Sequence, residues 1–258
     1  MPSIPDPAFP LELEQEIFTT AALMRSPHFF ALRTAYWFGS SPCSKSLAFR
    51  HDNIRNVFWW NLYRGERMLA LLSTCTGVQN LALRWLVPSM LPYLRKLQLR
   101  RLTLSQGSYY EPEGHFTVTQ LSQTEPFFAT LTHLHIHHVY GGYSTFDFQW
   151  LAGLPSLTHL CIENVGDNRR LLEFLQGCER LQVLVLCAFT WSMPTLDAGP
   201  WKDDWRVVIL RLDVDNRDHH IRDWKLGAAG GRDFWVRAEE FLAKKLNDKN
   251  ITTQFCDQ

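Results

Sequence analysis

Histidine, cysteine and glutamate gather at alternate positions in two neighbouring segments of the chain. Residues 131–138 carry His133, His135 and His137 between leucines and an isoleucine, and 26 residues later the alternation returns with His159, Cys161 and Glu163. Alternate side chains of a β-strand share a face, and neighbouring strands lie about 4.8 Å apart, so these six groups are expected side by side. Imidazole, thiolate and carboxylate are zinc ligands, but a flat strand face converges ligands poorly onto a tetrahedral ion. We therefore expect a polar protein-binding surface without a cofactor, and keep a metal site as the remote alternative.

Other chemistry finds no support in the sequence. There is no G-x-S-x-G, no P-loop and no H-E-x-x-H motif, so we expect no enzyme. The 26 basic and 26 acidic residues give no net charge, which argues against mainly electrostatic binding to nucleic acid. No apolar run reaches the roughly 18 residues of a membrane span, and the first residues lack the features of a signal peptide. Six cysteines without a C-x-x-C pair favour a reduced compartment, so the expected location is cytoplasm or nucleus.

A six-residue pattern, L-x-x-L-x-L, recurs along the chain. Its fourth position falls at Leu81, Leu97, Leu134, Leu160, Leu184 and Leu210. The spacings are 16, 37, 26, 24 and 26 residues, and the last three lie within the period of about 20–29 that is typical of leucine-rich repeats. The longest spacing contains a polar insertion at residues 106–114. Cys75 and Cys178, six residues ahead of two of these leucines, are expected in the core.

The sequence between the predicted strands predicts helices. Amphipathic stretches occupy residues 54–72, 146–154 and 168–177. Each unit of strand, turn and helix must stack on its neighbours to bury its apolar face. The expected fold is therefore α/β: a leucine-rich-repeat solenoid with a parallel sheet on the concave side and helices on the convex side.

The concave face and its rim are the expected partner-binding surface. The predicted residues are Lys96, Arg100, His133, His135, His137, His159, Glu163 and Arg211 on the face, and Trp191 in the loop 189–204. The face grades from basic, through histidine, to mixed. Exposed aromatic side chains on a rim are common anchors for a protein partner.

The N-terminal segment lies outside the repeats. Residues 9–18 follow the pattern F-P-x-E-L-x-x-x-I-F, which is similar to the opening of the F-box family, and the stretch from Leu32 to Phe38 keeps that family's leucine and aromatic residue. The resemblance implies a small helical head that binds the Skp-type adaptor of a cullin ubiquitin ligase. The residues that match the adaptor-binding surface are Pro10, Leu13, Ile17 and Leu32.

The C-terminal segment extends the resemblance. Asp223-Trp224 and residues 230–245 are similar to the end of F-box/leucine-rich-repeat proteins of fungi. Residues 232–246 predict an amphipathic helix with Phe234, Ala238, Phe241 and Leu242 inward, as a terminal repeat requires of its cap. The expected organisation is a head at 1–45, a solenoid at 46–226 and a capping helix with tail at 227–258.

The function that the resemblance implies is non-enzymatic. The head would bind the ligase adaptor, and the concave face would choose an unknown protein substrate. The alternative is a stand-alone leucine-rich-repeat scaffold without a ligase, and the remote one is a metal-binding protein that uses the His/Cys/Glu face.

Overall fold

The computed structural model describes residues 54–59, 65–106, 118–138, 148–163, 168–189, 201, 203–212, 219–228, 230–248 and 254–255. The chain divides into two units, Met1–Lys45 and Ser46–Gln258, and all described residues belong to the second. The predicted adaptor-binding residues Pro10, Leu13, Ile17 and Leu32 lie outside the described residues, and so does Trp191.

One parallel sheet organises the described part of the chain. Each strand pairs in parallel with the strand that follows it in sequence, in the order β1 to β8. The strands are β1 Asn56–Trp59, β2 Asn80–Leu83, β3 Arg101–Gln106, β4 His133–His138, β5 His159–Glu163, β6 Val183–Phe189, β7 Val207–Leu212 and the two-residue β8 Gln254–Phe255. The protein is thus of the α/β class, with helices between successive strands.

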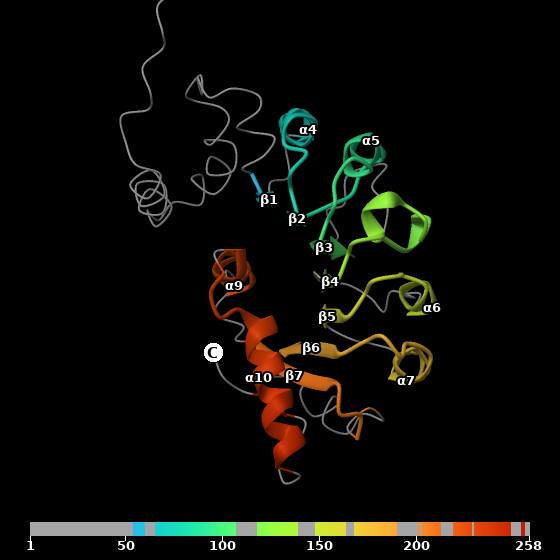
Figure 1. Cartoon of the computed structure of the whole chain (residues 1–258), viewed down its shortest axis with the longest axis vertical. Helices are drawn as coiled ribbons and strands as arrows, with labels where there is room; N and C mark the ends of the chain where they lie inside the picture. The colour runs from blue at the N-terminus through green and yellow to red at the C-terminus, as the bar shows by residue number, and fades with distance from the viewer. Residues whose placement is uncertain are drawn as a thin grey trace, which may run out of the picture. The chain divides into compact units, whose positions relative to one another are not determined.

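The helices lie on both sides of the sheet. Those between strands are α4 Gly65–Thr74, α5 Leu91–Leu94, α6 Phe148–Ala152 and α7 Asn168–Gly177, with 3-10 turns at Pro88–Met90, Val118–Gln120 and Pro126–Phe128. Figure 1 shows α4 to α7 along one side of the sheet, and α9 (His219–Ala228) and α10 (Phe234–Asn247) on the other. None of the described helices is both long and apolar enough to cross a membrane.

Aliphatic side chains define one face, here called the leucine face. Paired positions on β2 to β7 are Leu81, Leu102, Leu134, Leu160, Leu184 and Val207, each at most 2% exposed. They are 21, 32, 26, 24 and 23 residues apart, so the spacing is more regular than the sequence pattern indicated. Cys75 and Cys178 are buried at 0% and 3% exposure, which confirms the prediction for both.

The predicted strand at Val207–Leu212 is confirmed as β7, but the predicted register is wrong for β3 and β7. β3 begins at Arg101 and not in the stretch 94–99, so Lys96 and Arg100 are exposed in the connection before the strand and do not lie on the sheet face. In β7, Val207 rather than Leu210 pairs with Leu184. Both shifts are by an odd number of residues, and an odd shift exchanges the two faces of a strand. Arg211 therefore lies on the face opposite to the histidines.

The long helix predicted at 54–72 is also wrong. Its first part forms β1, and only residues from Gly65 onward form α4. Ile54, Val57 and Trp59 repeat the apolar spacing of the other strands, and Val57 pairs with Leu81. The helix predicted at 168–177 is confirmed as α7, and that at 146–154 corresponds to α6.

A glycine turn reverses the chain between α9 and α10. Gly230 has φ +76°, the left-handed conformation that a residue without Cβ adopts at no steric cost. The amide of Gly231 donates to the carbonyl of Leu226 (2.8 Å), and that of Gly230 donates to Gly227 (3.0 Å). This is the Schellman pattern of a helix end. The glycine run 227–231 therefore ends α9 and starts α10 on its course across the sheet.

Helix α10 has the predicted amphipathic stripe, which packs on the last two long strands of the sheet. Phe234, Ala238 and Leu242 are buried, Phe241 is partly buried, and Trp235 adds to the stripe at 5% exposure. These side chains pack against Val183, Val185, Cys187, Val208 and Leu210 of β6 and β7. The helix thus lies on the face of the sheet, while the free edge of β7 pairs with β8.

Loss of the indole at position 235 should destabilise the fold. We predict that Trp235→Ala lowers the free energy of unfolding by about 3–5 kcal/mol, because it removes a large aromatic side chain from a packed interface. Leu246→Ala on the same helix is the control: Leu246 is 63% exposed, and its loss should change stability by about 0.5 kcal/mol or less. Urea denaturation of both variants tests this, and equal effects would contradict the packing of α10 on the sheet.

Candidate functional site

The face under α9 and α10 carries the polar residues of the sheet and is here called the histidine face. Strand pairing arranges its side chains in three rows across the sheet. The first row is Asn80, Arg101, His133, His159 and Val183; the second is Ala82, Thr103, His135, Cys161, Val185 and Val208; the third is Ser105, His137, Glu163, Cys187 and Leu210. The rows run from polar on β2 to β5 to apolar on β6 and β7. The structure therefore brings together all six groups that the sequence singled out.

This face is covered rather than open. His135, His159 and Glu163 are exposed by only 5%, 5% and 1%, and His133 and His137 are partly buried. The expectation that the histidines form an exposed protein-binding surface does not fit this arrangement, because α10 lies over them. Phe234 and Trp235 contact the imidazoles edge-on: Phe234 meets His135 at 5.3 Å between ring centres, and Trp235 meets His133 at 5.2 Å.

Glu163 joins two of the histidines. Its Oε1 lies 3.1 Å from Nε2 of His135, and its Oε2 contacts Nδ1 of His137. Burial alone would raise the pKa of Glu163, but the two imidazoles outweigh that effect and hold the pKa well below its usual range. The carboxylate is therefore charged at neutral pH. Glu163 and the two histidines, which lie in the second and third rows, serve as hydrogen-bond partners for one another.

Two further carboxylates form hydrogen bonds at the start of α10. Asp233 caps the helix by accepting from the amide of Val236 (3.1 Å), and it accepts a second hydrogen bond from Nη1 of Arg101 on β3 (2.7 Å). Asp223 of α9 accepts from the amide of Phe234 (2.7 Å) and from Nη1 of Arg237 (2.8 Å). Buried charged groups need partners of this kind. These ion pairs and hydrogen bonds thus connect α9 to α10 and α10 to the sheet.

The last group joins histidines of β4 and β5 to Glu239 of α10. The rings of His133 and His159 stack with their centres 4.1 Å apart and their planes 8° from parallel. Oε1 of Glu239 lies 2.9 Å from Nε2 of His159. One ligand atom from each of His133, His159 and Glu239 lies within 4.8 Å of the other two, so these three residues can hold a metal ion.

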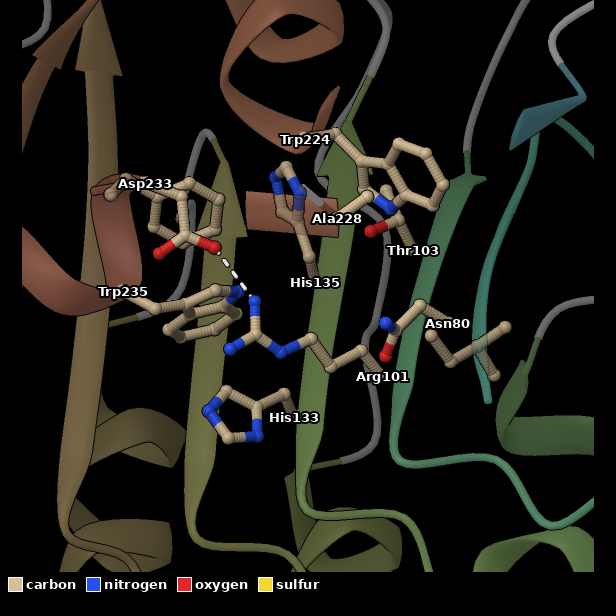
Figure 2. A pocket seen from close by; sticks show the side chains of 11 residues that line it. Asn80, Arg101, Thr103, His133, His135, Trp224, Ala228, Asp233 and Trp235 are labelled. Atoms are coloured by element: carbon tan, nitrogen blue, oxygen red, sulfur yellow. Dashed lines mark hydrogen bonds and ion pairs between the residues drawn. The ribbon is translucent and has the colours of Figure 1, made fainter. Parts of the chain in front are cut away.

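A small cavity borders this group. Figure 2 shows Arg101, His133, His135, Trp224 and Asp233 around it, with the Arg101–Asp233 ion pair across it. Its free volume is about 20 Å³, enough for a water molecule and far too small for an organic ligand. The cavity therefore offers solvent or an ion access to His133 without forming a substrate pocket.

The cysteines of this face belong to the core. The sulfur atoms of Cys161 and Cys187 lie 3.4 Å apart, and both residues are buried. Burial raises the pKa of Cys161 well above its usual value, so the thiol is protonated in this environment. Among the described residues, the cluster whose ligand atoms lie close enough for a metal ion is His133, His159 and Glu239, which does not include Cys161.

Five charged residues of the site were not among the predicted ones. They are Arg101, Asp223, Asp233, Arg237 and Glu239. The register error in β3 hid Arg101, and the pattern of α10 gave no indication of the strands on which it packs. No protein-family model, curated protein or solved structure matches the chain.

The Glu163 carboxylate should stabilise the fold in a pH-dependent way. We predict that Glu163→Gln costs about 3–5 kcal/mol at pH 7, because it leaves the imidazoles of His135 and His137 without their charged partner. The pKa of Glu163 is lower in the folded than in the unfolded chain, so its contribution is complete above the ordinary value of 4.5 and is lost as pH falls below it. The difference between wild type and variant should therefore shrink below pH 4.5.

Urea denaturation across pH 3–7 measures this difference. The control is Glu173→Gln, because Glu173 is an exposed carboxylate on α7 and its replacement should change stability by about 0.5 kcal/mol or less at every pH. A Glu163→Gln variant as stable as wild type at pH 7 would show that the imidazoles do not depend on the carboxylate.

Proposed function

We propose that the chain is a non-enzymatic substrate-recognition subunit of a Skp–cullin–F-box type ubiquitin ligase. In this proposal residues 1–45 form the adaptor-binding head, the strands and helices of the second unit form a leucine-rich-repeat solenoid, and an exposed part of that solenoid contacts a protein substrate.

The strand order carries the proposal. Strands that follow one another in sequence, all parallel, with apolar residues recurring 21 to 32 residues apart and helices between them, support a repeat architecture in which each unit stacks on the previous one. Such architectures serve mainly as binding surfaces for other proteins. The resemblance of residues 9–18 to the F-box opening supports the link to a ligase.

The covered histidine face moves the proposed substrate surface elsewhere. Lys96 and Arg100 are exposed just before β3, and Trp205 is 50% exposed just before β7. In a parallel sheet all strands begin at the same end of the sheet, so these three side chains lie at that amino-terminal end. Tryptophan and arginine are among the residues most enriched at protein-binding hot spots. We therefore propose the amino-terminal end of the sheet, and not the histidine face, as the substrate surface.

The adaptor-binding head gives the sharpest test. We predict that the full chain binds a purified Skp-type adaptor, and that Leu13→Asp with Ile17→Asp weakens binding at least about 100-fold, since hot-spot residues contribute about 2 kcal/mol or more each. Calorimetry measures the affinity, and circular dichroism checks that the variant keeps its helices and strands.

A second double variant serves as the control. Lys96→Glu with Arg100→Glu changes two exposed side chains of the other unit and should leave adaptor binding unchanged. Wild-type protein that binds no adaptor, or a head variant that binds as tightly as wild type, would contradict the ligase function and leave the stand-alone scaffold as the better explanation.

A further inference from the structure

We propose that His133, His159 and Glu239 form a zinc site that joins the sheet to α10. Two imidazoles from neighbouring strands and one carboxylate from the helix provide three ligands, the number typical of zinc sites that keep a fourth position for water. The set contains two nitrogen ligands, which favours zinc over magnesium or calcium, since those ions prefer oxygen throughout.

The threonine before each histidine can hold Nδ1 and leave Nε2 for a metal ion. The hydroxyl of Thr158 lies 2.8 Å from Nδ1 of His159 and 3.2 Å from the carbonyl of Thr132, so it can accept from Nδ1 while it donates to the carbonyl. Thr132 is placed in the same way, 2.8 Å from Nδ1 of His133 and 3.1 Å from the carbonyl of Arg100. With the proton on Nδ1, each imidazole would present the lone pair of Nε2 to the ion. Zinc-binding histidines show the same arrangement, with the second nitrogen held by a hydrogen bond.

Glu239 brings a charged ligand to the same nitrogen. Its Oε1 lies 2.9 Å from Nε2 of His159, so a metal ion bound by both atoms would take the place of the proton that they otherwise share.

The three ligand atoms would have to move only slightly closer together to bind one zinc ion. Bonds of about 2.0–2.1 Å to tetrahedral zinc place ligand atoms roughly 3.3 Å apart. The pair from His159 and Glu239 already lies within that separation, while the set as a whole spans up to 4.8 Å. The side chain of Glu239 is 51% exposed and is free to adjust toward the stacked rings.

The side chains around the site are compatible with the positive charge of a zinc ion. The nearest cation on the face, Arg101, is already paired with Asp233 at 2.7 Å. The cavity beside His133 has room for a water molecule. Trp235, one turn before Glu239 on α10, contacts both rings edge-on, with ring centres 5.2 and 5.8 Å away.

Zinc titration of the chelator-treated full chain tests the site. We expect one zinc ion per chain by calorimetry, and intense visible absorption of tetrahedral Co²⁺ when cobalt replaces zinc. Glu239→Gln should weaken zinc binding at least about tenfold because it removes a ligand charge at a half-exposed position. Thr158→Val should weaken it by about 10–100-fold, the effect of losing the group that orients a ligating histidine.

Glu240→Gln is the matched control. It neutralises the neighbouring carboxylate of the same helix, which pairs with Arg232 and not with the histidines, so zinc affinity should stay at the wild-type value. A chain that binds no stoichiometric zinc would overturn the proposal. So would equal zinc affinities of the Glu239→Gln and Glu240→Gln variants, since binding would then not involve Glu239.

Discussion

A parallel sheet has to be covered on both faces, and the rest of this structure follows from how that requirement is met. The leucine face meets it with aliphatic side chains and the helices between strands. The histidine face carries imidazoles, a glutamate and an arginine on β3 to β5, which an apolar helix alone could not cover at an acceptable cost. The C-terminal helices solve this with both kinds of contact: Trp235 and Leu242 bury apolar surface, while Asp223 and Asp233 pair with arginines.

The sequence pattern predicted the class of fold because its signal is local. Apolar residues at a fixed spacing identify each strand from a few neighbouring positions, and the parallel sheet with intervening helices is the arrangement that such units permit. The pattern failed where two alternative spacings overlapped. Leu94, Leu97 and Leu99 fit the motif, and so do Leu99, Leu102 and Leu104, but only the second set provides the strand. Since the two choices differ by five residues, the error also changed the predicted face.

The candidate site could be predicted only in part because its contacts join distant parts of the chain. The three histidines of β4 and the groups of β5 belong to neighbouring strands, and strand pairing was enough to place them together. Arg101 and Asp233 are 132 residues apart, and His159 and Glu239 are 80 apart. The amphipathic stripe of α10 predicts that the helix packs on an apolar surface, but the stripe alone does not identify which surface. The polar partners, which no periodicity reveals, select the histidine face.

The contacts of Glu239 connect the proposed zinc site to the position of α10. Two of the three ligands lie on the sheet and the third on the helix, so the complete site exists only when α10 covers the histidine face. A ligand that binds only one of two states stabilises that state, by about 2.7 kcal/mol when its concentration is 100 times the dissociation constant. Zinc at this position would therefore hold the helix on the sheet. Loss of zinc would weaken the cover over His135 and Glu163, the same side chains that an open concave surface would present to a partner.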